Sequence, residues 1–202
     1  MPVYTLDGAA YNGQVRLYAI PADDDNAYYR FDLVALAGSN DTATGVANVT
    51  LSSAGGGPHV GVVIAAGTAS GGTGGGAGGP LINPQNLDLT TVPTSKTVPW
   101  YVAVADDPNL IFEIQEGGTG TNLTAATGVG NANILYAAGT YFSGTTLNNG
   151  SVATTADLDL KIMQFVQRVD NHFVTSPATG GGSQKWNVMI NNHAYKYYVV
   201  GA

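Results

Sequence analysis

The histidines are the side chains best suited to acid–base or metal chemistry near neutral pH, but their spacing supports neither. They are His59, His172 and His193. No two lie three to five residues apart and none belongs to a His-Glu-x-x-His pattern, so a zinc site would need ligands from distant loops. Each follows a turn or lies near a strand end. We therefore expect these histidines in turns or at the surface.

The sequence also lacks the motifs that usually provide a nucleophile or bind a phosphate. The sequence has no cysteine, which excludes thiolate nucleophiles, disulfides and cysteine-ligated metals. It has no Gly-x-Ser-x-Gly pentapeptide to place a serine nucleophile on a sharp turn. The glycine-rich run at 67–79 ends in Gly-Gly-Pro rather than Gly-Lys-Ser/Thr, so we do not expect it to hold a phosphate. The sequence predicts a protein that is not an enzyme, with no catalytic and no cofactor-binding residues.

Acidic residues gather at 23–25 and at 106–107. Calcium accepts several carboxylate and carbonyl oxygens from one loop, but the Asp-x-Asp-x-Asp-Gly spacing of a calcium loop is absent. We expect solvated turns and no metal ligands, with a calcium-binding turn as the alternative. Glu113 and Glu116 are three apart on an expected strand and so face opposite sides of a sheet. This placement argues against a joint acid–base role in glycoside hydrolysis.

In the segments around these residues, apolar and polar side chains alternate with a period of two, which is typical of half-buried strands. Leu158, Leu160 and Ile162 are expected to point one way, and Asp159 and Lys161 the other. Further strands are expected at 15–20, 29–36, 47–51, 60–65, 100–105, 110–115, 133–136, 186–191 and 195–200. Turn residues separate them, and no segment shows a capped helical stripe. The fold class predicted is all-β and mainly antiparallel, as a β-barrel or a β-sandwich.

The glycine-rich run divides the sequence in one of two ways. In the first, residues 1–66 form an N-terminal β lobe, 67–80 are a linker, and 81–202 form a C-terminal β lobe. In the alternative, residues 1–202 are one domain with a long glycine-rich loop. A faint repeat between 18–26 and 101–109 is explained either by a duplicated β unit, one per lobe, or by turn residues chosen independently in two hairpins.

The net charge of the protein and the short length of its apolar runs argue against nucleic acid and membrane partners. The formal net charge of −7 at pH 7 disfavours binding to DNA phosphates and to anionic membrane surfaces. No apolar run reaches the ~18 residues of a membrane-spanning helix. The N-terminus lacks a basic start and an apolar stretch, so we expect no secretory signal and synthesis in a cytoplasm.

Aromatic residues occur as doublets, at Tyr28–Tyr29, Trp100–Tyr101 and Tyr141–Phe142. Because neighbours on a strand face opposite sides, each doublet is expected to place one ring inward and one outward. Outward tyrosine and tryptophan rings make good contact surfaces for proteins or sugars, and ordinary sheet packing is the alternative.

Three segments carry a resemblance to a known class of proteins. They are 98–117, the stretch from 143 to 171 that includes Lys161-Ile162-Met163 and 166–171, and 186–193. Together these segments resemble small structural proteins encoded among the head genes of tailed bacteriophages, of the capsid decoration or cement kind. The resemblance covers about the last half of the chain and implies no catalytic residues.

The resemblance implies a non-enzymatic virion protein that binds the outside of a capsid and stabilises it. Its partner would be the major capsid protein, it would act as a trimer or dimer, and its location would be the capsid surface after synthesis in the host cytoplasm. Five residues are the expected contacts, namely Trp100, Tyr101, Asp106, Asp107 and Pro108. A carbohydrate-binding β-sandwich module is the alternative, and a tail or neck component of the same virion is a further one.

Overall fold

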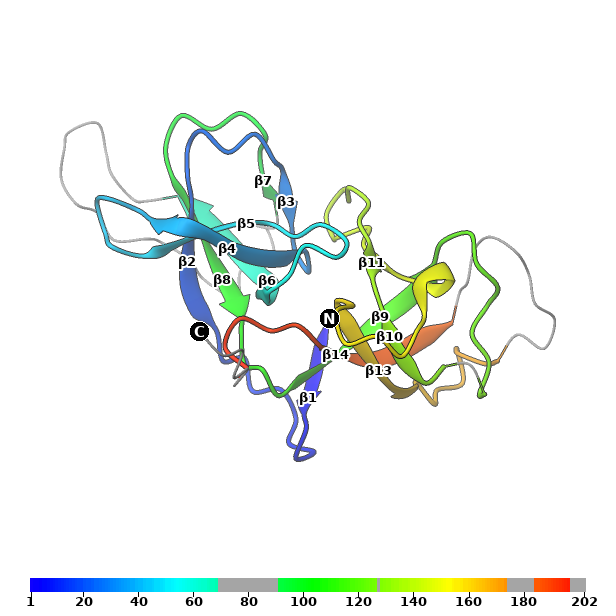
Figure 1. Ribbon diagram of the computed structural model, residues 1–202. Coiled ribbons are helices and arrows are strands. Elements are labelled where there is room, and N and C mark those ends of the chain that lie inside the picture. The colour runs from blue at the N-terminus through cyan, green and yellow to red at the C-terminus, as the bar shows by residue number, and fades with distance from the viewer. Residues whose placement is uncertain (69–90, 127, 174–183, 197–202) are drawn as a thin grey trace.

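The computed structural model describes residues 1–68, 91–126, 128–173 and 184–196. These residues form two β units that lie side by side, a closed barrel and a larger sheet, as Figure 1 shows. The described residues contain no α-helix, and their single helical element is the 3-10 turn η1 (Asn149–Ser151). The prediction of an all-β fold with a barrel is confirmed.

The barrel closes in the order β2-β5-β4-β6-β8. Its strands are β2 (Arg16–Ile20), β4 (Leu33–Asn40), β5 (Ala47–Leu51), β6 (His59–Thr68) and β8 (Trp100–Ala105). Its neighbouring strands are antiparallel except for β2 and β5, which are parallel. Valines dominate the interior because β-branched side chains pack well on a pleated surface; they are Val34, Val49, Val60, Val63, Val102 and Val104.

The second unit is a seven-stranded sheet in the order β10-β13-β14-β9-β12-β11, with β1 also paired to β9. Its strands are β1 (Pro2–Thr5), β9 (Leu110–Gly117), β10 (Gly130–Ala132), β11 (Ile134–Leu135), β12 (Thr146–Asn148), β13 (Leu160–Phe165) and β14 (Lys185–Ile190). A small pair, β3 (Tyr28–Tyr29) and β7 (Thr91–Val92), lies beside the barrel. The parallel pairs β12–β9 and β2–β5 depart from the antiparallel expectation.

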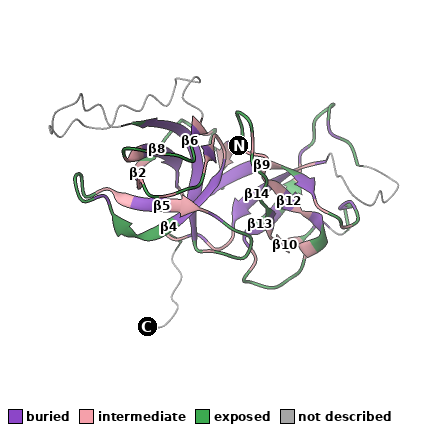
Figure 2. Ribbon diagram, turned by 90° about the horizontal axis from the view of Figure 1, so that it is seen from above, coloured by how far each residue is buried: buried purple, intermediate pink, exposed green. Residues whose placement is uncertain are grey.

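The predicted alternation holds on the core strands of the sheet. Leu160, Ile162, Val188 and Ile190 are buried in one core cluster that also includes Leu33 and Val62 of the barrel. Figure 2 shows the buried strands of both units and the exposed second half of β4. Asp159 is the exception, because β13 begins only at Leu160 and the carboxylate turns inward.

The barrel contains strands from both sides of the glycine-rich run, which differs from a division into lobes at 67–80. Strand β8 follows that run in the sequence, yet it pairs with both β2 and β6 and closes the barrel. The repeated segments 18–26 and 101–109 therefore place neighbouring strands in one barrel rather than one in each lobe. Residues 69–90, which hold most of the run, lie outside the described residues.

An aromatic cluster forms around the buried Trp186 of the second sheet. The Trp186 ring meets Phe165 and Phe173 edge-on, at centroid distances of 5.3 and 5.9 Å. Its Nε1–H donates to Glu116 Oε2 at 3.0 Å, and Gln184 Nε2 donates to the other carboxylate oxygen at 3.2 Å. Burial raises the pKa of Glu116, and these donors oppose the rise. The carboxylate thus fixes the orientation of the indole.

Gly128 lies against this fixed indole, and its replacement by alanine is expected to lower the free energy of unfolding. A Cβ at Gly128 would lie 2.2 Å from Trp186 Cη2. Overpacking of this kind costs about 1–3 kcal/mol. The matched control is Gly150→Ala, whose Cβ would meet only ordinary contacts, at 3.4 Å from Asn148 Oδ1 and at 3.5 and 3.6 Å from the N and Cα atoms of Gly120. Urea denaturation followed by circular dichroism compares the two variants, and equal midpoints would contradict the expectation.

Candidate functional site

The five contact residues expected from the sequence lie at the two ends of β8, and two of them form buried contacts within the chain. Tyr101 is buried, and its hydroxyl donates to Asp41 Oδ2 at 2.9 Å. Asp106 is buried and accepts a hydrogen bond from the Tyr18 hydroxyl at 2.6 Å. Both side chains are therefore engaged within the chain, and a role of these five residues in partner contacts stays a prediction.

The other three expected contact residues are half-buried. Trp100 packs against the barrel core. Asp107 and Pro108 form the turn before β9, where Asp107 Oδ1 accepts the Asn109 N–H at 2.8 Å. An aspartate that bonds the backbone two residues on is a common turn device. Trp100 and Tyr101 begin β8, whereas Asp106, Asp107 and Pro108 follow its other end, so the five residues do not form one exposed patch.

Two of the histidines are buried, which corrects the expectation of surface histidines, and only His172 is exposed. His193 accepts the Tyr195 N–H at Nδ1 over 3.0 Å. Burial lowers the pKa of His193 to about 4, so this imidazole is neutral at pH 7. His59 lies at the start of β6 and is fully buried.

His59 connects Ser52 and Asp159 in a hydrogen-bonded chain. Its Nδ1 lies 2.9 Å from Ser52 Oγ, and its Nε2 lies 2.9 Å from Asp159 Oδ1. These are the residue types of a serine hydrolase triad. All three are buried, with 4%, 0% and 1% exposure for Ser52, His59 and Asp159, so no substrate reaches the hydroxyl in this fold. The arrangement is therefore a structural link.

The link joins the barrel to the second sheet. Ser52 and His59 belong to the barrel side, whereas Asp159 directly precedes β13. Asp159 also accepts the N–H groups of Gly55 and Ile134, both at 3.0 Å. Burial alone would raise the pKa of Asp159, but hydrogen bonds from His59 and from these N–H groups outweigh it and hold the pKa below its usual value.

Another buried carboxylate, Asp32, has no cationic partner among the interactions found for it. Its Oδ2 accepts the Tyr29 N–H at 2.7 Å. Burial raises the pKa of Asp32 to about 6, against the opposing effect of hydrogen bonds from Ser143 and Tyr29. Because the carboxyl binds its proton more tightly in the folded state than in the unfolded state, ionisation of Asp32 opposes folding.

This charge predicts a pH-dependent effect of Asp32→Asn. The Asp32 penalty is small near pH 4, grows as the pH rises, and is complete above the folded pKa of about 6. The stability of the variant relative to the parent should therefore rise by about 2–3 kcal/mol between pH 4 and pH 7, at 1.36 kcal/mol per pKa unit. Urea denaturation at a series of pH values measures the difference. A flat or falling difference would contradict the assignment.

The acidic turns and the glutamates show no metal or catalytic arrangement in the residues that are described. Asp24 Oδ1 accepts the Asn26 N–H at 2.7 Å, and Asp24 Oδ2 accepts the Tyr28 hydroxyl at 2.6 Å, as in a turn. No group of three or more potential metal-ligating His, Cys, Asp or Glu side chains occurs within the described ranges. Glu113 and Glu116 face opposite sides of β9, one half-buried and one fully buried.

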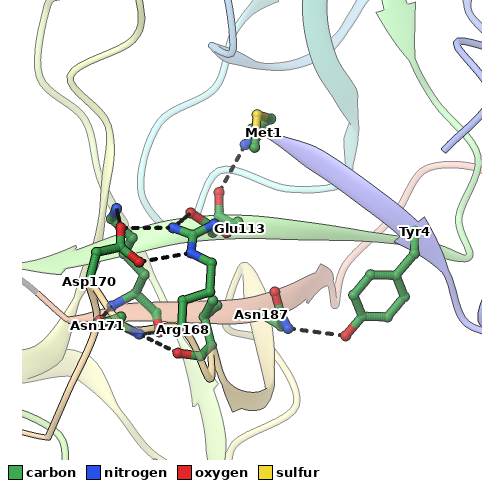
Figure 3. A network of polar contacts seen from close by, with 9 residues as sticks. Met1, Tyr4, Glu113, Arg168, Asp170, Asn171 and Asn187 are labelled. Atoms are coloured by element: carbon green, nitrogen blue, oxygen red, sulfur yellow. Dashed lines mark hydrogen bonds and ion pairs between the residues drawn. The ribbon is translucent and has the colours of Figure 1, made fainter. Parts of the chain in front are cut away.

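The half-buried Glu113 belongs to a network of charges on the second sheet, drawn in Figure 3. Arg168 binds both of its carboxylate oxygens, at 2.7 and 2.9 Å, and also reaches Asp170 Oδ1 at 3.1 Å. Lys185 Nζ donates to Asp170 Oδ2 at 3.2 Å. These contacts lower the pKa of Asp170 and raise the pKa of Arg168. The charges are thus paired with one another.

The two most exposed aromatic side chains among the described residues occur together in one segment, residues 135–142, which we call the aromatic loop. Tyr141 is 68% exposed and Phe142 is 53% exposed, so both rings of this doublet face outward. This differs from the expected one-in, one-out arrangement. Leu135 and Tyr136, at the start of the loop, are also exposed. The Tyr28–Tyr29 and Trp100–Tyr101 doublets each have one buried and one half-buried ring.

The aromatic loop is anchored by contacts with Arg30 and Phe31. The Phe142 ring stacks on Phe31, with ring centroids 5.7 Å apart. The Ser143 N–H donates to the Arg30 carbonyl at 2.8 Å. A Cβ at Gly139 would lie 1.7 Å from the Phe142 carbonyl oxygen, so the loop closes only with glycine there. The exposed rings are therefore presented on a fixed backbone.

Comparisons of the chain with protein-family models, with curated proteins and with solved structures find no match. Within the described ranges, no helix has the length and apolar character needed to span a membrane.

Proposed function

We propose that the protein is a non-enzymatic virion protein that binds the outer surface of a bacteriophage capsid and stabilises the shell. The observation that supports this proposal most directly is the aromatic loop, which presents Tyr141 and Phe142 to solvent. Exposed aromatic residues on a fixed backbone are typical of protein-binding hot spots, because they offer large contact areas at small entropic cost. The partner is the major capsid protein.

The charge and the expected symmetry agree with an outer position. A net charge of −7 is repelled by packaged DNA phosphates, which favours the outside of the head over its interior. A trimer or dimer bound around a symmetry axis engages several identical sites at once. Such shared contacts bind tightly through effective concentration even when each one is weak.

A measurement of the thermal stability of capsids, with and without the protein, tests this function. A protein that binds the assembled shell, and not its dissociated subunits, raises the temperature of disruption by mass action. Capsids with the protein bound are therefore expected to release their DNA at a higher temperature than capsids without it, as followed by the fluorescence of a DNA-binding dye. Equal release temperatures would contradict the stabilising role, and bovine serum albumin at the same concentration is the control.

The exposed tyrosine also favours one other function, a carbohydrate-binding module. An exposed ring such as that of Tyr141 offers an apolar face on which a sugar ring packs. Retention of the protein on immobilised cell-surface polysaccharide, reversed by Tyr141→Ala, would favour this second function. Binding to capsids without such retention would favour the first.

A further inference from the structure

An apolar cavity of about 270 Å³ lies between the barrel and the second sheet. Leu33 and Val62 line it from the barrel, and Phe112, Leu160 and Val188 line it from the sheet. These side chains are nearly fully buried in the chain. A cavity of roughly 150 Å³ lined by such side chains holds a benzene molecule. The space here therefore accommodates a larger molecule of one or two rings.

The charges around this cavity are already paired. Glu113 and Lys185 are the charged side chains in its lining. Glu113 is held by both terminal nitrogens of Arg168, and Lys185 Nζ is held by Asp170. Burying a charged ligand beside apolar walls is costly unless an opposite charge is free to pair with it. The lining therefore favours an uncharged occupant.

Phe31, which also lines the cavity, has a strained backbone. Its φ of 75° makes it the one described non-glycine residue with a positive φ. This conformation is unfavourable for a bulky side chain and persists only where the surroundings enforce it. Here the Phe31 N–H donates to the Val63 carbonyl at 2.7 Å, and the ring stacks on Phe142. The strain places an aromatic ring in the cavity wall, and such strain is concentrated at ligand-binding sites.

We propose that this cavity is a binding site for a small, uncharged, apolar molecule of one or two rings. The ligand packs against Phe31 and Phe112 and against the aliphatic side chains of both β units. Its binding removes apolar surface from water at a place where the barrel and the second sheet meet. The proposal is independent of capsid binding, because it concerns the interior of the isolated chain.

The test is a titration of the parent protein with toluene, followed by NMR of the leucine and valine methyl groups. Saturable shifts are expected for the methyl groups that line the cavity, in Leu33, Val62, Leu160 and Val188. Val49 and Val102 in the barrel interior are internal controls and should not shift. Benzoate carries the same ring with a charge and should not bind. Absence of saturable shifts, shifts centred on the barrel interior, or equal binding of benzoate would overturn the proposal.

A variant locates the site independently. Val62→Phe places a larger side chain in the cavity, and we expect toluene to bind at least tenfold more weakly. Val129→Phe is the matched control, because Val129 is 75% exposed, and its affinity for toluene should equal that of the parent. Unchanged binding by a folded Val62→Phe variant would overturn the assignment. If that variant does not fold, the methyl shifts of the parent decide the question.

Discussion

Asp159→Asn is expected to be among the most destabilising single substitutions in the chain, lowering the free energy of unfolding by about 3–5 kcal/mol. The Asp159 carboxylate accepts hydrogen bonds from His59, Gly55 and Ile134, and it is almost fully buried. An amide keeps the shape but turns one acceptor into a donor that faces other donors. Replacing a buried carboxylate that accepts several hydrogen bonds leaves its donors unsatisfied.

Urea denaturation of the parent and of Asp159→Asn at pH 7 measures this loss. Asp170→Asn is the matched control, because Asp170 is an exposed partner of Arg168 and Lys185 and its replacement should change stability little. An Asp159→Asn variant as stable as the control would contradict the structural link between barrel and sheet.

The same carboxylate contributes an acid-dependent term to stability. Because the pKa of Asp159 is lower in the folded protein than in the unfolded chain, its contribution is present above the unfolded value. It is lost as the pH falls through the folded pKa. The difference in stability between the parent and Asp159→Asn should therefore shrink on acidification below about pH 4.

The local strand pattern was accessible to sequence reasoning, because it depends on alternation along single segments. Leu160 and Ile162 were expected to face a core and do so. The closure of the barrel was not accessible, since β8 pairs with β2 and β6 across long sequence separations. Pairing of this kind depends on the global packing of strands rather than on any local signal.

The buried polar link was missed for a related reason. His59 and Asp159 are 100 residues apart, and neither lies in a motif that predicts the other. Asp159 was assigned to an outward position by extending the alternation one residue too far, whereas β13 begins at Leu160. Tyr101 and Asp106, two of the expected contact residues, form hydrogen bonds inside the barrel unit, with partners that no local motif predicts.

The aromatic loop was only partly foreseeable. The Tyr141–Phe142 doublet is visible in the sequence, but the one-in, one-out rule assumes a regular strand. These residues lie instead between β11 and β12, where the backbone follows a loop. Strand periodicity therefore could not predict that both rings are exposed.

The second large effect expected concerns that loop. Tyr141→Ala is expected to weaken capsid binding by about 30-fold per site, equivalent to about 2 kcal/mol for the loss of an aromatic hot spot. Phe142→Ala should have a similar effect, because it also removes the stack on Phe31. Cosedimentation of each variant with capsids that lack the protein measures the affinity.

The control for this series is Val129→Ala, an exposed apolar side chain outside the aromatic loop. It should bind capsids as the parent does. Parent-like binding by both Tyr141→Ala and Phe142→Ala would show that the aromatic loop is not the contact surface.

The most direct test of the proposed function is electron cryomicroscopy of phage particles that have been produced or incubated with this protein. We expect density for both the barrel and the seven-stranded sheet at symmetry-related positions on the outside of the shell, with the aromatic loop against the major capsid protein. Density for the chain only inside the head, or none on the capsid surface of particles that contain it, would contradict the proposal.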